Sequence, residues 1–204
     1  MRRQSSCAAA ARPDGSIAVH DLATSMTPRR LPPGRNDTDT TSLLIHPTGK
    51  SIAVGDSVGV QIRDLRTGAA GATFSFPAGA YSLAWHPNGK HLAGAGVDKS
   101  IRVWEANATG GKLVHSVFAH EGAVIRLAYA TTGETLYSLS EDRSAKSWDA
   151  AKMSERIVYA AQADTPLTLA VRPDHAQLAI GRYDGVLVLL DEKTGKTQSE
   201  PLPA

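Results

Sequence analysis

Four short polar turns recur along the chain at nearly constant spacing. They begin at His46, His86, Ala130 and Arg172, so successive turns lie 40, 44 and 42 residues apart. The first two turns are near copies of each other, HPTGK and HPNGK. A period of about 40–45 residues is typical of a structural unit that buries its apolar surface only by packing against further copies of itself. This repeat limits the possible folds more strongly than composition does.

Each turn is followed by the same succession of elements. A short apolar run comes first (SIAVG, HLAGAG, ETLYSLS or QLAIG), then a polar turn with an aspartate, and then an alternating strand that ends in an acid. The turn aspartates are Asp56, Asp98, Asp142 and Asp184, and the strand-ending acids are Asp64, Glu105, Asp149 and Asp191. The aspartate-to-acid interval is seven residues in the last three units and eight in the first, which indicates a local adjustment in that unit.

The N-terminal region carries the end of the same unit. Asp14 and Asp21 are again seven residues apart, and residues 6–11 occupy the place of the preceding strand. The strands are runs of four to seven residues separated by Gly, Pro, Asn and Asp, and no segment has the apolar spacing of a helix. We therefore expect an all-β chain in which each unit is a four-stranded antiparallel sheet and the sheets stack face to face.

The strand ends carry a family resemblance. Val103-Trp104-Glu105 and Ser147-Trp148-Asp149 resemble the Trp-Asp ending of WD40 repeats, and Ala119-His120 resembles the Gly-His dipeptide of that family. The resemblance implies a β-propeller of four-stranded blades. It also implies that Asp14, Asp64, Asp98, Trp104, Asp149, Asp184 and Asp191 mark the repeat. Other blades depart from the pattern, since His20, Arg63 and Leu190 stand where the family has Trp.

The same resemblance implies one complete structural tetrad. His120, Ser138, Asp142 and Trp148 match the His, Ser, Asp and Trp positions of a buried hydrogen-bond network that fixes the blade, with Ser140 as the alternative serine. Blades without these residues are expected to lack the network.

The repeat count predicts an incomplete propeller. We expect a single region over residues 1–204, with a partial blade at 1–36 and blades at about 37–77, 78–119, 120–162 and 163–204. About four full blades and part of a fifth would form an open arc or an imperfect ring, since propellers have 4–8 blades. We expect the chain to be part of a larger propeller or multidomain protein.

Composition bounds the remaining possibilities. Hydrophobic residues are 42% and charged residues 21% of the chain, which is typical of a globular protein, and the net charge is only +2. Cys7 is the single cysteine, so no intrachain disulfide is expected. The start, MRRQSSC, is too weakly apolar for an export signal, and a cytoplasmic location is the default expectation. The richness in Ala, Gly and Arg favours a bacterial source.

No residue set points to catalysis, a cofactor or a metal. His86 and His91 are five apart, but no further ligand joins them at metal-binding spacing, so we interpret them as turn residues. Ser138, Asp142 and His120 have the side chains of a hydrolase triad, yet their strand positions favour the structural tetrad. The motif GxxxxGK[ST] is absent, and the one GxSxG sequence, at residues 55–59, does not include Ser138. An enzyme or cofactor-bearing propeller with an axial site stays open as an alternative.

One end of the propeller is the candidate protein-binding face. By position, the turns and strand starts at this end include Tyr81, Lys99, Arg126, Arg143, Arg182 and Tyr183. Tyr and Arg are frequent anchors of protein interfaces. We therefore predict a non-catalytic interaction scaffold whose partners are other proteins or sister domains. Residues 1–35 hold six Arg against two Asp, which leaves nucleic-acid binding through the N-terminal region as a further alternative.

Overall fold

The computed structural model describes residues 7–23, 27–33, 40–77, 79–172 and 177–202. These residues form strands and turns, with no helix among them. In particular, this part of the chain holds no helix of the length and apolarity that a membrane span requires. All strand pairs are antiparallel, and the strands group into five separate sheets in chain order.

The first sheet has three strands and each later sheet has four. The first is β1 (Cys7–Ala11), β2 (Ile17–Asp21) and β3 (Arg29–Leu31). The second is β4 (Ser42–Ile45), β5 (Ser51–Gly55), β6 (Gly59–Asp64) and β7 (Ala70–Ser75). The third is β8 (Ala80–Trp85), β9 (His91–Gly96), β10 (Ser100–Ala106) and β11 (Gly111–Phe118). The fourth is β12 (Val124–Tyr129), β13 (Thr135–Ser140), β14 (Ala145–Asp149) and β15 (Glu155–Val158). The fifth is β16 (Pro166–Arg172), β17 (Gln177–Arg182), β18 (Leu187–Asp191) and β19 (Thr197–Leu202).

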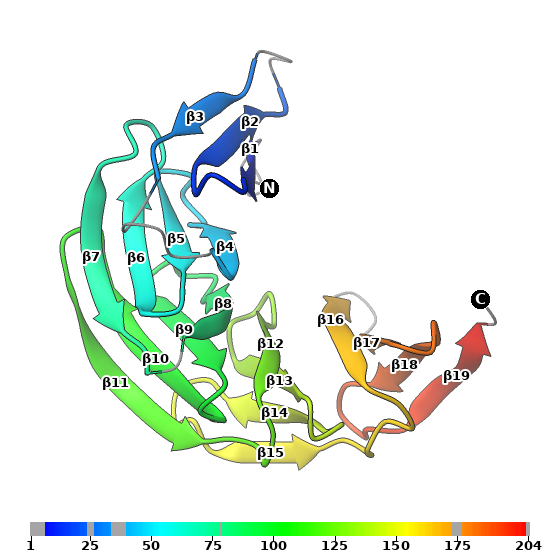
Figure 1. Cartoon of the computed structure of the whole chain (residues 1–204). Helices are drawn as coiled ribbons and strands as arrows, with labels where there is room; N and C mark the ends of the chain where they lie inside the picture. Colours follow the sequence, from blue (N-terminus) through cyan, green and yellow to red (C-terminus); the bar gives the residue numbers. More distant parts are fainter. Residues whose placement is uncertain (1–6, 24–26, 34–39, 78, 173–176, 203–204) are drawn as a thin grey trace.

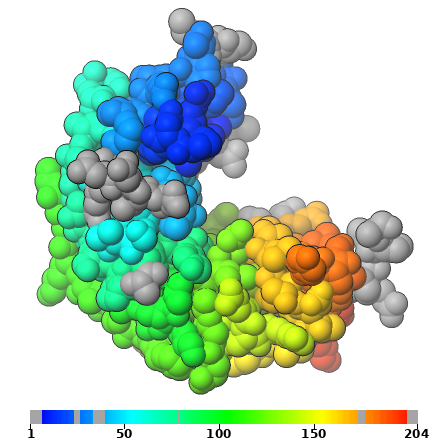
Figure 2. All heavy atoms as spheres, viewed as in Figure 1, coloured from blue at the N-terminus to red at the C-terminus, as the bar shows by residue number. Residues whose placement is uncertain are grey.

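The sheets are arranged as the vanes of an open arc (Figure 1). The first strand of each four-stranded sheet, β4, β8, β12 or β16, lies on the inside of the arc, and β7, β11 and β15 lie on the outside. The concave side is hollow between the N-terminal and C-terminal sheets (Figure 2). The expected all-β, incomplete propeller with about four full blades and part of a fifth is thus confirmed.

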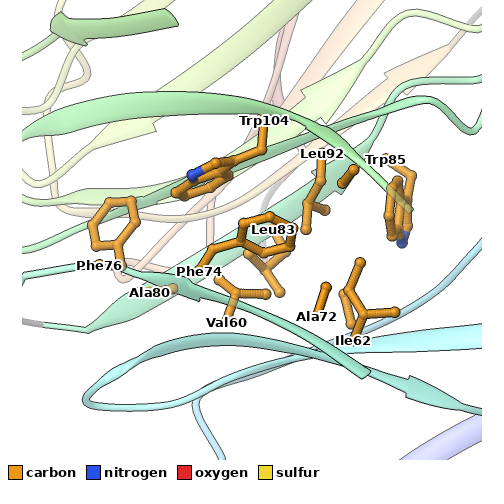
Figure 3. Packing of buried hydrophobic residues seen from close by; sticks show 12 residues of the cluster. Val60, Ile62, Ala72, Phe74, Phe76, Ala80, Leu83, Trp85, Leu92 and Trp104 are labelled. Carbon is orange, nitrogen blue, oxygen red and sulfur yellow. The ribbon is translucent and has the colours of Figure 1, made fainter. Parts of the chain in front are cut away.

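Apolar side chains fill the spaces between successive sheets. Between the second and third sheets, Val60 and Ile62 of β6 pack with Leu92 and Trp104 of the next sheet (Figure 3). Alternate residues of one strand pack against the two different neighbouring sheets, because successive side chains of a strand point to opposite faces. On β9, Leu92 belongs to the cluster with the second sheet, and Ala93 belongs to the cluster with the fourth. Each inner sheet is therefore held by two apolar layers.

Burial distinguishes the inner sheets from the fifth sheet. All six residues of β13 in the fourth sheet are buried. In β17 of the fifth sheet only Leu178 and Ile180 are buried, and both pack against the fourth sheet. The other face of the fifth sheet leaves Leu187 37% exposed. The fifth sheet thus buries one face, as expected for the last vane of an arc.

The aspartate turns have one geometry in four sheets. The residue after the turn aspartate has a positive φ: Gly15 (75°), Lys99 (64°), Arg143 (70°) and Gly185 (81°). In each of these turns the aspartate Oδ1 accepts the N–H of the residue two positions later, at 2.8–3.2 Å. An aspartate side chain stabilises a tight turn by accepting this N–H. In the second sheet Asp56 accepts the N–H of Val58 at the same two-residue spacing and also that of Gly59, which accommodates the one-residue longer interval.

Candidate functional site

The fourth sheet brings the four predicted tetrad residues together. His120 precedes β12, Ser138 is on β13, Asp142 is in the following turn and Trp148 is on β14. Trp148 Nε1 donates to Ser138 Oγ (2.8 Å), and Ser138 Oγ lies 2.7 Å from His120 Nε2. His120 Nδ1 lies 3.2 Å from Asp142 Oδ2 and 2.9 Å from Ser144 Oγ.

The donors and acceptors of this network fix the histidine tautomer. A carboxylate only accepts, so His120 Nδ1 carries the proton and Nε2 accepts from the Ser138 hydroxyl. Ser138 in turn accepts from Trp148, so every polar atom of the row has a partner. Ser138 is 0% exposed and His120 is 2% exposed. The serine hydroxyl is therefore enclosed by its own hydrogen-bond network.

Charge in the network is concentrated on Asp142. Burial alone would raise the pKa of this carboxyl, but the hydroxyl and N–H of Ser144, the N–H of Glu121 and His120 outweigh it and hold the pKa at about 2. Burial lowers the pKa of His120, although the charge of Asp142 opposes the shift. Both shifts favour the pair as carboxylate and neutral imidazole near neutral pH.

The strand-ending acids close the outer turns of their sheets. Asp64 Oδ1 accepts the N–H groups of Arg66 and Thr67 and the hydroxyl of Thr67, and Asp191 does the same with Lys193 and Thr194. These hydrogen bonds lower the pKa of both carboxyls. Their role is therefore to stabilise turns.

Other repeat positions also serve local structure. Asp149 Oδ1 accepts the N–H groups of Ala151 and Lys152, while Oδ2 pairs with Arg156 (2.7 Å). Asp98 pairs with Arg102 (2.5 Å). Trp104 is 4% exposed and packs against Phe74 and Phe76, with ring centroids 5.4 and 6.0 Å apart.

The six residues of the candidate protein-binding face lie on one face of the arc, the one at which β8, β12 and β16 begin. Tyr81 is 40% and Tyr183 76% exposed, and Arg126 and Arg143 are also exposed. Arg182 is tied to Asp184 by two hydrogen bonds of 3.1 and 2.6 Å. The six are spread over the third, fourth and fifth sheets.

Sequence reasoning missed a role for the two copies of the HPxGK turn. His46 Nε2 donates to the carbonyl of Gly89 (2.8 Å), and His86 Nε2 donates to the carbonyl of Gly133 (2.9 Å). Each histidine thus joins its own sheet to the turn of the next sheet. Each ring also meets the aromatic residue at the end of the next inner strand, with centroids 4.6 Å apart for His46 and Trp85.

The glycines of these turns are required by the same contact. Gly89 and Gly133 have φ of 70° and 81°. A Cβ on either would come within 2.8 Å of His46 Cε1 or 2.5 Å of His86 Cε1. The repeat of the turn at one-sheet spacing was the available signal, but the sequence does not show that the His of one turn reaches the Gly of the next.

The junction of the fourth and fifth sheets is built differently, since Ala130 replaces the histidine. Tyr137 and Tyr159, both buried, donate their hydroxyls to Glu192: Tyr137 to its carboxylate and Tyr159 to its carbonyl (2.6 Å). Burial raises the pKa of both phenols. This junction therefore depends on phenol donors where the earlier ones use imidazole.

Among the residues that the structure describes, no group of three His, Cys, Asp or Glu side chains is placed to hold a metal ion. His86 and His91 stack edge to face, with centroids 5.8 Å apart.

Comparison with known proteins agrees with these observations. A model of the WD40 repeat, described as WD domain, G-beta repeat, matches residues 72–105 and 111–149. One chain in the crystal structure of the mitotic checkpoint complex is similar with a TM-score of 0.82 at 20% sequence identity. The match covers 93% of this chain and 58% of that chain. No curated protein matches the sequence.

The five sheets and their repeated aspartate turns place the chain in the class of proteins built from successive β-propeller blades. In this chain the blades form an open arc. Within this class the two matched segments are WD40 repeats, so the WD40 resemblance read from the sequence is confirmed. The likeness to the checkpoint-complex chain concerns the fold, and this chain spans 58% of that chain's length.

Proposed function

We propose that the chain is a non-catalytic protein-interaction scaffold built from WD40 repeats and is part of a larger propeller or multidomain protein. In this proposal residues 1–204 act as one propeller region, and its partners are proteins or sister domains. The proposal is supported by the fact that the side chains that could act in catalysis are engaged in hydrogen bonds within the fold. Ser138, Asp142 and His120 form a buried network, and His46 and His86 join neighbouring sheets.

The candidate protein-binding face supplies the contact residues. Tyr183 is 76% exposed on a turn whose ends are fixed by antiparallel strands. Arg143 is exposed and Lys99 is half-buried, and both lie in turns that their aspartates stabilise by hydrogen bonds. Exposed Tyr and Arg on a rigid scaffold bind a partner at small entropic cost.

Site-specific photo-crosslinking tests this function. A photoreactive phenylalanine analogue at Tyr183 is compared with the same analogue at Val158, which is 53% exposed on the outer strand β15. We expect a discrete protein adduct from position 183 in cells that express the full protein, and little or none from position 158. Absence of an adduct at 183, or equal adducts at both positions, would contradict a protein-binding role for this face.

A further inference from the structure

A pocket lies between the two HPxGK turns, on the face of the arc opposite the candidate protein-binding face. It has a volume of about 630 Å³ and lies where the second and third sheets meet. Its wall includes His46 and Lys50 of the first turn, Lys90 of the second, Trp85 of β8, Ile62 of β6 and Ala108 of the β10–β11 turn. Pockets of about 300–1,000 Å³ with apolar walls and a few polar groups are the usual form of ligand sites.

Trp85 is an unusual wall residue because its polar atom is unused. The residue is 8% exposed, and Nε1 has no hydrogen-bond partner among the described residues. In contrast, Trp148 Nε1 has Ser138 as its acceptor. The Trp85 nitrogen points away from Trp104 and the apolar cluster (Figure 3). A buried N–H without an acceptor costs about 1–3 kcal/mol, so an acceptor brought by a ligand would be favoured.

The wall beside Trp85 is rigid. The His46 ring packs edge-on against the indole, and its two nitrogens are held by the carbonyl of Gly89 and the N–H of Thr48. The indole donor is therefore presented in a fixed direction. Fixed donors cost a ligand little in ordering.

The charges at the rim favour a neutral occupant. Lys50 and Lys90 line the pocket together with Asp64 and Glu105, two cations against two anions. Asp64 Oδ1 is already occupied by its own turn, and no ion pair joins these four side chains to other described residues. Both acids would repel a polyanion, and both lysines would repel a polycation. A peptide main chain offers donors and acceptors without net charge, and an apolar side chain matches Ile62 and Ala108.

We propose that this pocket binds an extended peptide segment of a partner protein. One bulky apolar side chain enters the pocket, and a main-chain carbonyl accepts the hydrogen bond of Trp85 Nε1. The proposal rests on the interaction-scaffold function and gives it a second site with a defined ligand chemistry.

Peptide selection on the full chain provides the test. The probe is a display library of random 12-residue peptides, followed by affinity measurement of the selected peptides. We expect uncharged segments with a Leu, Met or Phe. Trp85→Phe keeps a ring but removes the donor, and it should weaken binding about 5–10-fold, the loss of one hydrogen bond.

A second pair of variants separates the pocket from general damage. Ala108→Trp fills the pocket from an exposed turn and should abolish peptide binding. Ala151→Trp makes the same change at the exposed β14–β15 turn, which lines the neighbouring pocket between the third and fourth sheets, and should leave binding unchanged. Both variants should keep the strand-type circular dichroism of the parent.

Several outcomes would overturn the proposal. These are selection of acidic or basic peptides, no selected peptide at all, or equal effects of Ala108→Trp and Ala151→Trp. Crosslinking at Tyr183 is measured on the parent chain used for the selection. An adduct at position 183, together with no peptide selected by the parent chain, would reject the pocket and leave the interaction scaffold intact.

Discussion

Removal of the Asp142 carboxylate is the perturbation for which the structure gives the most detailed expectation. The carboxylate accepts four hydrogen bonds, from the N–H and hydroxyl of Ser144, the N–H of Glu121 and His120 Nδ1, at 2.6–3.2 Å. Asp142→Ala removes the acceptor of the Ser144 and Glu121 N–H groups and leaves His120 Nδ1 with Ser144 Oγ (2.9 Å) as its remaining partner. Since an unsatisfied buried donor costs about 1–3 kcal/mol, we expect a loss of about 2–4 kcal/mol in the free energy of unfolding.

Asp56→Ala is the matched control. Asp56 occupies the same turn position in the second sheet, where it accepts the N–H groups of Val58 and Gly59 and no tetrad histidine is present. We expect a loss of about 1–2 kcal/mol, smaller than for Asp142. Urea unfolding followed by tryptophan fluorescence gives both values from the midpoints and slopes. Equal midpoints for the two variants would refute the reasoning.

The pH dependence provides an independent check of the same site. The pKa of Asp142 is lowered from 3.8 to about 2, so its stabilisation is fully present above pH 4–5 and is lost as the pH falls toward 2. With allowance for solvent screening this amounts to about 1–2 kcal/mol. The pKa of His120 is also lowered, so protonation of this residue destabilises the fold as the pH falls below about 6.5. The difference in stability between the parent and Asp142→Ala should therefore shrink between pH 5 and pH 3. A difference that stays constant over this range would contradict the assigned pKa.

Three further substitutions test separate features by the same urea assay. His86→Ala removes the bond to Gly133 and the ring contact with Tyr129, so we expect a loss of about 1–3 kcal/mol, and an unchanged midpoint would remove its assigned role between the sheets. Gly133→Ala places a Cβ at a φ of 81° and within 2.5 Å of the same ring, so it should destabilise by more than about 1 kcal/mol, whereas a stabilised variant would show that the ring can move. Lys99→Gly relieves a φ of 64°, so it should raise the stability by about 0.5–1 kcal/mol, and a destabilised variant would show that the Lys99 side chain contributes contacts of its own.

The sequence predicts the sheets because their signals are local. Asp14-Gly15 and Asp184-Gly185 mark tight turns by the conformations that these residues favour, and alternating runs such as IRVWE mark strands. The spacing of such signals is sufficient to order strands within one sheet. The same spacing predicts three strands in the first sheet, because the repeat pattern assigns no segment to the position of its inner strand.

Contacts between sheets are harder to predict because they depend on how far one sheet is rotated against the next. His46 and Gly89 are 43 residues apart, and His86 and Gly133 are 47 apart, and no local pattern joins them. The same holds for Tyr137 and Glu192, which meet only because the fifth sheet packs against the fourth. The tetrad residues could be named because a family resemblance supplied their spacing, which the residues alone do not give.

The central claim is that successive sheets stack in phase with the repeat and are joined by the HPxGK histidines. Nuclear Overhauser effects between aromatic protons test it directly in solution. We predict cross-peaks between the His46 ring and the Trp85 indole, whose centroids are 4.6 Å apart, and between the His86 and Tyr129 rings, 5.0 Å apart. Cross-peaks that instead join these rings to residues outside the next sheet, or a helical pattern of backbone effects, would contradict the account.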